Sequence, residues 1–154
     1  MTDIRKVGVI GAGVMGAGIA AHMANAGLPV VLLDVVPDGA NARNALSDAA
    51  VARLLKTNPA PLMHKRNARR IVTGNIEDDL NQLGECDWII EAIIENLDAK
   101  RDLYARIETE RKTDSIVSSN TSTIPLEKLT EGLPERFCKD FAITHFFNPP
   151  RYMR

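Results

Sequence analysis

The most constraining feature of this sequence is a glycine-rich run at residues 11–16, which reads Gly-Ala-Gly-Val-Met-Gly. It follows a short β-branched segment, residues 6–10, and opens a stretch of small residues that extends to Gly27. A GxGxxG run between a strand and a helix is typical of βαβ units that bind dinucleotides. The run therefore predicts a strand, a tight turn and a helix, although similar glycines also occur in turns that bind no ligand.

The positions of the run have different parts in such a site. Gly11 permits the tight turn, Gly13 lets a pyrophosphate approach the backbone, and Gly16 allows the helix to pack closely on the sheet. Val14 and Met15 lie at the start of the helix, where free backbone N–H groups favour a negatively charged ligand. We therefore expect these five residues to form the phosphate-binding part of a cofactor site.

An acidic residue at the end of the second predicted strand indicates which cofactor binds. Residues 29–34 are nearly all apolar up to Asp34, which lies 18 positions after Gly16. A carboxylate in this place accepts hydrogen bonds from the adenosine ribose and repels the additional phosphate of NADP. No arginine follows in residues 35–37. The expected cofactor is therefore NAD, and the alternative is an acid that merely ends a strand.

The rest of the chain continues to alternate between strand-like and helix-like segments. Such alternation predicts a parallel sheet with right-handed crossovers. We expect an α/β fold of the Rossmann type, with a doubly wound, mainly parallel sheet and helices on both faces, formed by residues 1–154 as one domain. The predicted helices cover residues 40–56, 62–70, 99–112 and 125–133, and the predicted strands cover 71–73, 87–94, 115–119 and 141–145.

Composition and charge argue against several classes of function. Nineteen basic and twenty acidic residues give a formal net charge of -1, so no general attraction to nucleic acid or an anionic membrane is expected. No apolar run reaches the length that spans a bilayer and no leader opens the sequence, which favours the cytoplasm. Cys86 and Cys138 are far apart and show no metal-ligand spacing, so we expect reduced thiols and no metal site.

Polar residues follow three of the later strands, where those strands are expected to end. They occupy residues 95–100, 118–122 and 145–150. The carboxyl ends of parallel strands share one edge of a sheet, and ligands of such sheets bind at that edge. We therefore expect the three segments to meet the cofactor site.

Together these motifs resemble the NAD-binding domain of L-3-hydroxyacyl-CoA dehydrogenases. The resemblance rests on the glycine run, on Glu-Ala-Ile-Ile-Glu-Asn at 91–96, on Ser-Asn-Thr-Ser at 119–122 and on His-Phe-Phe-Asn-Pro at 145–149. Residues 58–62 and 73–79 are similar to bacterial multifunctional members, which join this dehydrogenase to an enoyl-CoA hydratase. The resemblance implies an enzyme that oxidises L-3-hydroxyacyl-CoA to 3-oxoacyl-CoA with NAD in fatty-acid β-oxidation.

The resemblance also implies roles for four side chains. His145 would be the general base for the 3-hydroxyl, Ser122 would hydrogen-bond the 3-oxygen, and both Glu95 and Lys100 would contact the cofactor. Histidine chemistry supports the first role independently, because imidazole accepts and returns protons near neutral pH. Position alone leaves other interpretations open. His145 could be a polar residue that leaves a strand, and Ser122 could start a helix. Glu95 and Lys100 could lie in a solvated first helical turn.

One basic cluster lies in and after the second predicted helix. In the family this region meets the phosphates of coenzyme A, and the alternative is a solvated helix face. We assign His22 and His64 to ordinary helix surfaces. The cluster comprises Lys56, Lys65, Arg66, Arg69 and Arg70.

Some parts of the family pattern lie beyond the last residue of this chain. The relatives hold the histidine with a glutamate twelve residues later, which corresponds to position 157, and they carry a helical C-terminal domain with an asparagine of the active site, much of the acyl-binding surface and the dimer interface. We therefore expect cofactor binding but little turnover by this chain alone, and a homodimer for the full-length protein. We also expect Phe146 and Phe147 to be exposed. The competing hypotheses are a non-catalytic NAD-binding module and a dehydrogenase of another hydroxy acid.

Overall fold

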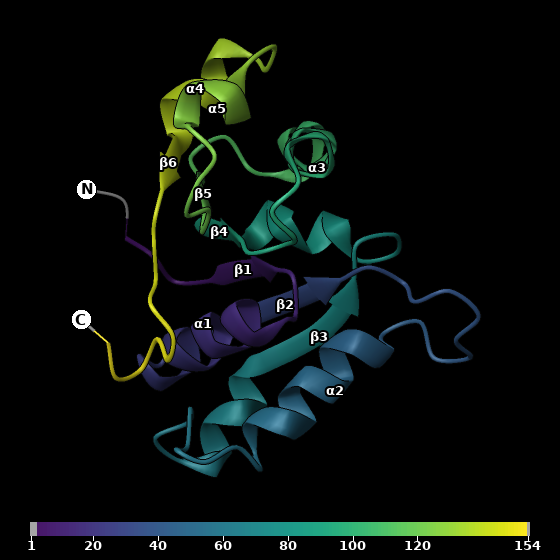
Figure 1. Cartoon of the computed structure of the whole chain (residues 1–154), viewed down its shortest axis with the longest axis vertical. Coiled ribbons are helices and arrows are strands. Elements are labelled where there is room, and N and C mark those ends of the chain that lie inside the picture. Colours follow the sequence, from purple (N-terminus) through teal and green to yellow (C-terminus); the bar gives the residue numbers. More distant parts are fainter. Residues whose placement is uncertain (1–2, 154) are drawn as a thin grey trace.

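Six parallel strands form one sheet at the centre of the structure, a computed structural model that describes residues 3–153 (Figure 1). The order across the sheet is β3-β2-β1-β4-β5-β6, and every neighbouring pair is parallel. The first strand, β1, lies in the middle of the sheet. The next two strands extend the sheet on one side of β1, and the last three extend it on the other side. This order confirms the predicted doubly wound Rossmann-type fold. The strands are β1 (Val7–Ile10), β2 (Val30–Asp34), β3 (Ile71–Asn75), β4 (Trp88–Glu91), β5 (Ile116–Ser119) and β6 (Phe141–Ile143).

Helices cover both faces of this sheet. In Figure 1, α1 and α2 lie beside one half of the sheet, while α3, α4 and α5 lie beside the other. The helices are α1 (Val14–Asn25), α2 (Ala45–Leu54), α3 (Leu97–Glu110), α4 (Leu126–Thr130) and α5 (Glu135–Asp140), and the 3-10 helices are η1 (Lys65–Arg70) and η2 (Leu80–Glu85).

The two helical layers explain why the central strands are apolar at nearly every position. Successive side chains of a strand point to opposite faces of its sheet. Val7 and Val9 of β1 therefore belong to the core beneath α1 and α2, whereas Ile10 belongs to the core on the other face. Burying one such side chain stabilises the fold by about 1.5 to 3 kcal/mol.

Several predicted elements are shorter in the structure, and two helices are additional. Residues 62–70, predicted as one helix, form only η1, which buries none of its residues. The helix predicted over 125–133 ends at Thr130, and Gly132 follows in a left-handed conformation with φ +80°. The sequence pattern does not predict η2 or α5, because six residues are too few to establish a helical period.

The last strand is also shorter than predicted, and this changes the setting of His145. Strand β6 ends at Ile143, so His145 lies in the connection that follows. Phe147 is 55% exposed, which confirms that part of the prediction. The expectation that Phe146 is exposed is wrong. Its ring is half-buried in the core beneath α1 and lies 6.4 Å from the Trp88 ring.

Both cysteines are free thiols, as predicted. Burial raises the pKa of the Cys86 thiol to about 11, so this side chain stays protonated and unreactive near neutral pH. Among residues 3–153, no helix combines the length and the apolar character needed to cross a membrane. The same part of the chain brings no three metal-ligating side chains together.

Candidate dinucleotide-binding cleft

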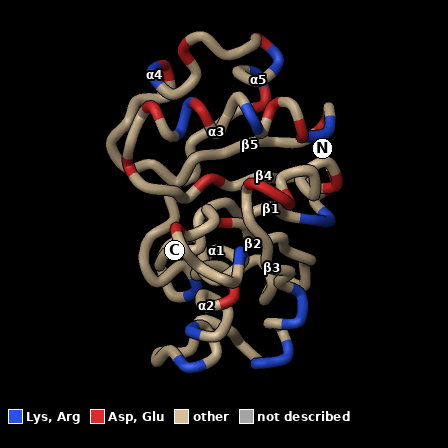
Figure 2. The backbone as a smooth tube through the Cα atoms, turned by 90° about the vertical axis from the view of Figure 1, so that its right-hand side faces the viewer, with Lys and Arg blue, Asp and Glu red and all other residues tan. Residues whose placement is uncertain are grey.

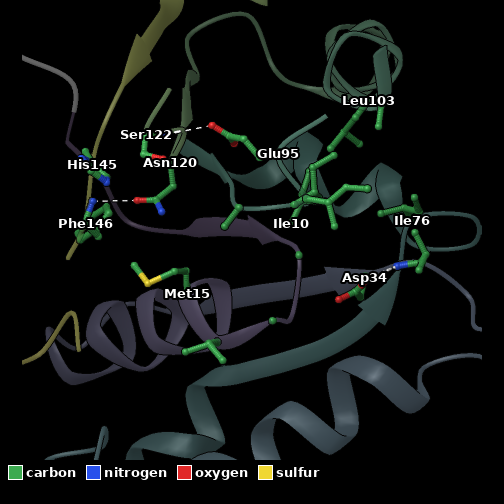
Figure 3. Close-up of a pocket in the computed structure, with 18 of the residues that line it drawn as sticks. Ile10, Met15, Asp34, Ile76, Glu95, Leu103, Asn120, Ser122, His145 and Phe146 are labelled. Atoms are coloured by element: carbon green, nitrogen blue, oxygen red, sulfur yellow. Dashed lines mark hydrogen bonds between the residues drawn. The ribbon is translucent and has the colours of Figure 1, made fainter. Parts of the chain in front are cut away.

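A cleft of about 880 Å³ lies along the carboxyl edge of the sheet (Figure 3). Asp34 lies at one end of it, where β2 ends. Ser122 and His145 lie at the other end, on the connections that follow β5 and β6. The structure thus brings residues from opposite halves of the sheet to one cavity, as expected for ligand sites of doubly wound folds.

The glycine turn, which lines the cleft with Gly11 and Gly13, leaves no room for side chains at two of its positions. Gly11 has φ +101°, and a Cβ there would lie 2.5 Å from the carbonyl oxygen of Ala92. A Cβ on Gly16 would lie 1.7 Å from the carbonyl oxygen of Gly11. Because both residues lack a side chain, the start of α1 can lie close against the ends of β1 and β4.

Gly13 is different, because a Cβ there would meet nothing within 4 Å. The backbone at Gly13 faces open space at the N-terminus of α1, and no side chain of residues 3–153 caps this helix. Val14 and Met15 of the first turn line the cleft. The turn therefore fits a pyrophosphate group, which would accept hydrogen bonds from the uncapped N–H groups.

Asp34 lies beside the glycine turn and is held by two backbone groups. Its Oδ2 accepts a hydrogen bond from the N–H of Ala12 at 2.6 Å, and its Oδ1 accepts one from the N–H of Val35 at 2.7 Å. Each carboxylate oxygen has a further lone pair. The half-buried side chain lines the cleft, so these remaining acceptor positions fit the two hydroxyls of a ribose.

Glu95 anchors the connection after β5 at the other end of the cleft (Figure 3). Its Oε1 accepts hydrogen bonds from the hydroxyls of Thr121, at 2.5 Å, and Thr123, at 2.9 Å. The backbone N–H groups of Ser122 and Thr123 reach the same oxygen at 3.3 Å. Partial burial by itself would raise the pKa of Glu95, but these hydrogen bonds and the charge of Lys100 outweigh it and lower the pKa to about 2. Glu95 is therefore ionised at neutral pH.

The burial of Lys100 contradicts one of the two interpretations of the sequence. Its side chain is only 1% exposed, so the interpretation as a solvated helical turn is wrong. It is also not among the residues that line the cleft. Its Nζ lies 2.6 Å from Oε1 of Glu91 and 3.5 Å from Oε2 of Glu95, because the first turn of α3 packs directly over the end of β4. The structure places Lys100 behind Glu95 and not beside the cavity.

The segment that carries His145 is attached to the sheet on both sides of that residue. The backbone N–H of Thr144 donates to the carbonyl of Ser119 at 3.0 Å. The backbone N–H of Phe146 donates to Oδ1 of Asn120 at 2.8 Å (Figure 3). The exposed His145 ring lies against Phe147, with 4.7 Å between ring centroids. The backbone therefore directs this imidazole toward the same end of the cleft as Ser122.

The other two histidines lie outside the cleft. His64 is exposed and accepts a hydrogen bond from the N–H of Arg66 at the start of η1. The assignment of His22 to an ordinary helix surface is wrong. Within the described chain, its Nδ1 is buried without a hydrogen-bond partner, and its ring lies edge-on to Phe146 at 6.5 Å. The returning C-terminal segment covers this part of α1, which no local sequence pattern reveals.

Two polar residues that line or support the site are absent from the sequence-based candidates: Asn120 lines the cleft and Glu91 lies behind it. Glu91 is a single acid within the apolar segment 88–94, and Asn120 lies inside the Ser-Asn-Thr-Ser motif. The sequence signal for Glu91 is an acidic residue within an apolar strand, because a fully buried carboxylate requires partners. The signal for Asn120 is its place directly after a strand that ends at the ligand edge.

The basic cluster, defined above by Lys56 and four residues of η1, is separate from the cleft. Figure 2 shows Lys and Arg gathered at the end of the molecule near α2. None of the five residues is buried, and none lines the main cleft. The structure therefore separates this cluster from the cofactor site.

Comparison with known proteins identifies the family. The family model described as "3-hydroxyacyl-CoA dehydrogenase, NAD binding domain" matches residues 6–154. A probable 3-hydroxyacyl-CoA dehydrogenase of Deinococcus radiodurans is 53% identical over 150 residues, which cover 97% of this chain and 43% of that protein. A probable 3-hydroxyacyl-CoA dehydrogenase of Bacillus subtilis is 48% identical over 165 residues, covering 98% of this chain and 21% of that protein. The family match confirms NAD as the expected cofactor.

Solved structures show the same relationship. The chain superimposes with a TM-score of 0.80 on 3-hydroxybutyryl-CoA dehydrogenase of Escherichia coli, at 26% identity over 99% of this chain and 31% of the other. The TM-score with (S)-3-hydroxybutyryl-CoA dehydrogenase of Ralstonia eutropha is 0.73, at 33% identity over 98% of this chain and 52% of the other. The chain spans less than half the length of both curated relatives. It belongs to the family of NAD-binding domains of 3-hydroxyacyl-CoA dehydrogenases.

Proposed function

We propose that this chain is the cofactor-binding domain of a longer enzyme that oxidises L-3-hydroxyacyl-CoA to 3-oxoacyl-CoA in fatty-acid β-oxidation. One observation carries the proposal. The glycine turn and Asp34 lie at one part of a single cleft whose other end holds Ser122 and His145. This arrangement supports a site for a dinucleotide next to a general base.

The side chains at the His145 end account for the chemistry of alcohol oxidation. The nicotinamide ring of NAD, when bound, supplies the acceptor for the hydride from C3. A ring nitrogen of His145 takes the proton of the 3-hydroxyl, and the protonated ring returns it in the reverse direction. The Ser122 hydroxyl donates a hydrogen bond to the 3-oxygen and positions it. Among residues 3–153, Ser122 donates to Glu95 through its backbone N–H, which leaves its hydroxyl for this contact.

We further propose a cytoplasmic location, which the two free thiols and the bacterial relatives support. The acyl chain and the coenzyme A phosphates would be bound by the whole protein, with the basic cluster as one candidate contact for the phosphates. A homodimer formed through residues outside this chain is the oligomeric state that the family resemblance implies.

The experiment that tests the proposed function is an assay of the full-length protein with acetoacetyl-CoA. We expect NADH to be consumed only when acetoacetyl-CoA is present, followed as the loss of absorbance of the reduced nicotinamide. A short hydroxy acid or a sugar acid, with NAD, is the control substrate. Turnover of the control substrate without turnover of acetoacetyl-CoA would contradict the proposal.

The role of Asp34 can be tested by binding measurements on this chain alone. Replacing Asp34 with alanine removes two charge-assisted hydrogen bonds to the ribose, each contributing about 1.5 to 3 kcal/mol. We expect the affinity for NAD to fall by at least about tenfold and the affinity for NADP to fall less, because the carboxylate repels the additional phosphate. Isothermal titration calorimetry measures both constants. Asp38→Ala, which removes the same charge from the exposed loop nearby, is the matched control. Equal losses for both cofactors would contradict the ribose assignment.

A further inference from the structure

A fully buried ion pair lies behind the His145 end of the cleft. Glu91 is 0% exposed and Lys100 is 1% exposed, and Nζ of Lys100 lies 2.6 Å from Oε1 of Glu91. Removing two charges from water is costly, and an apolar pair of similar volume often stabilises a protein as well or better. A contribution to stability therefore does not by itself explain this buried pair.

The hydrogen bonds of Glu91 join three elements of the fold. Its Oε1 also accepts from the backbone N–H of Ile93 at 2.7 Å. Its Oε2 accepts from the hydroxyls of Tyr104 in α3 and Ser119 in β5, each at 2.6 Å. All acceptor positions face donors, so the carboxylate is fixed in one orientation. Lys100 is fixed in turn by this carboxylate.

Lys100 of this pair also contacts Glu95, which lines the rim of the cleft. Nζ of Lys100 lies 3.5 Å from Oε2 of Glu95, and the other oxygen of Glu95 accepts all four hydrogen bonds from the connection 121–123. Glu95 is itself partly exposed, and its side chain would otherwise be free to adopt several rotamers. The buried ammonium group is the one charged group that contacts its oxygens from the protein interior among the residues described.

We propose that Glu91 and Lys100 are positioning residues, which hold Glu95 and, through it, the connection 121–123 that carries Ser122 at the rim of the cleft. Their effect on the proposed reaction is indirect, because neither lines the cavity. This inference rests on the proposed function for its catalytic consequence, but the structural link from Lys100 to Ser122 is testable without it.

The decisive variant is the double substitution Glu91→Gln/Lys100→Met. Either single substitution leaves a buried charge without its partner and endangers the fold. In the double variant neither of these two positions carries a charge. The side-chain carbonyl of the introduced glutamine accepts from the N–H of Ile93, while its amide group donates to the two hydroxyls, which act as acceptors as well as donors. The double variant thus removes the support of Glu95 and keeps the interior satisfied.

Two NMR measurements on the isotope-labelled chain, without cofactor, test the structural link from Lys100 to Ser122. In NMR spectra at neutral pH, we expect the amide protons of Ser122 and Thr123 to move upfield in the double variant, because their hydrogen bonds to Glu95 lengthen. In a titration from pH 7 to pH 4, we expect the Glu95 carboxyl resonance to stay constant in the unsubstituted chain, whose Glu95 pKa is about 2, and to begin to change in the double variant. Lys139→Met removes an exposed lysine paired with Glu135 and serves as the control.

A third readout uses the full-length protein. Displacement of Ser122 lowers kcat with acetoacetyl-CoA by about 10- to 100-fold. The KM for acetoacetyl-CoA changes by no more than about threefold, because Ser122 positions the reacting oxygen and most binding contacts stay intact.

The possible results distinguish failure of the positioning role from failure of the proposed function. A double variant that folds with unchanged Ser122 and Thr123 amide resonances and an unchanged Glu95 titration overturns the positioning role, and the pair is then only structural. Failure of the unsubstituted chain to bind NAD overturns the proposed function and leaves the NMR result valid. A change at the amides without a fall in kcat overturns the catalytic consequence.

Discussion

Replacing His145 with alanine in the full-length protein is expected to lower kcat with acetoacetyl-CoA by about 10²- to 10⁴-fold. This range is typical for the loss of a positioned general acid or base. The ring lies at the Ser122 end of the cleft, and the backbone on both sides is attached to β5 and the residue after it. The substitution therefore removes the proton acceptor and preserves the path of the chain. Stopped-flow or steady-state measurement of NADH consumption gives the rate.

The same variant should retain its affinity for NAD, since the glycine turn and Asp34 are untouched. Calorimetric titration of this chain with and without the substitution tests that expectation. His64→Ala, at an exposed position before η1 and outside the cleft, is the matched control and should leave turnover unchanged. A His145→Ala enzyme that keeps more than about a tenth of the original kcat would contradict the role of His145 as general base.

The single substitution Lys100→Met should have the largest effect on stability. It leaves the Glu91 carboxylate fully buried without a counter-charge, and breaking a buried pair in this way typically costs about 3 to 5 kcal/mol. Because domains of this size have unfolding free energies of about 5 to 15 kcal/mol, the variant loses a large part of its stability. Urea denaturation at neutral pH, analysed with a common m-value, measures the change.

The double variant Glu91→Gln/Lys100→Met should recover most of that loss, because removing both charges abolishes the unpaired carboxylate. Lys139→Met should cost no more than about 0.5 kcal/mol, since its ion pair with Glu135 is exposed on both sides. Similar losses in the single and the double variant would show that the charge pairing of Lys100 is not what the fold requires.

The sequence predicts the parts of the site that are local. The glycine run fixes the turn within six residues, and Asp34 is found by its distance from that turn and by the apolar strand before it. Both predictions depend only on the direction in which the chain runs through a single strand. The doubly wound order follows from the alternation of elements, because right-handed crossovers leave few other topologies.

The parts that the sequence does not reveal depend on contacts between distant segments. Lys100 has the same appearance as the charged residues that follow it along α3, and only the packing of that helix on β4 buries it. Its partner Glu91 is shared with Tyr104 and Ser119, which come from different elements. His22 and Phe146 likewise meet only because the segment after β6 returns across α1. A pattern of local spacing carries no information on such long-range contacts.

The hydrogen bond between Ala12 and Asp34 has a consequence for any attempt to redesign cofactor preference. The usual strategy for accepting NADP exchanges the acid at the end of β2 for a neutral or basic residue. Here that exchange also leaves the Ala12 N–H without its acceptor and loosens the loop that receives the pyrophosphate. A successful redesign must therefore supply a new oxygen for this N–H together with a cation for the added phosphate, and the two requirements call for at least two simultaneous substitutions.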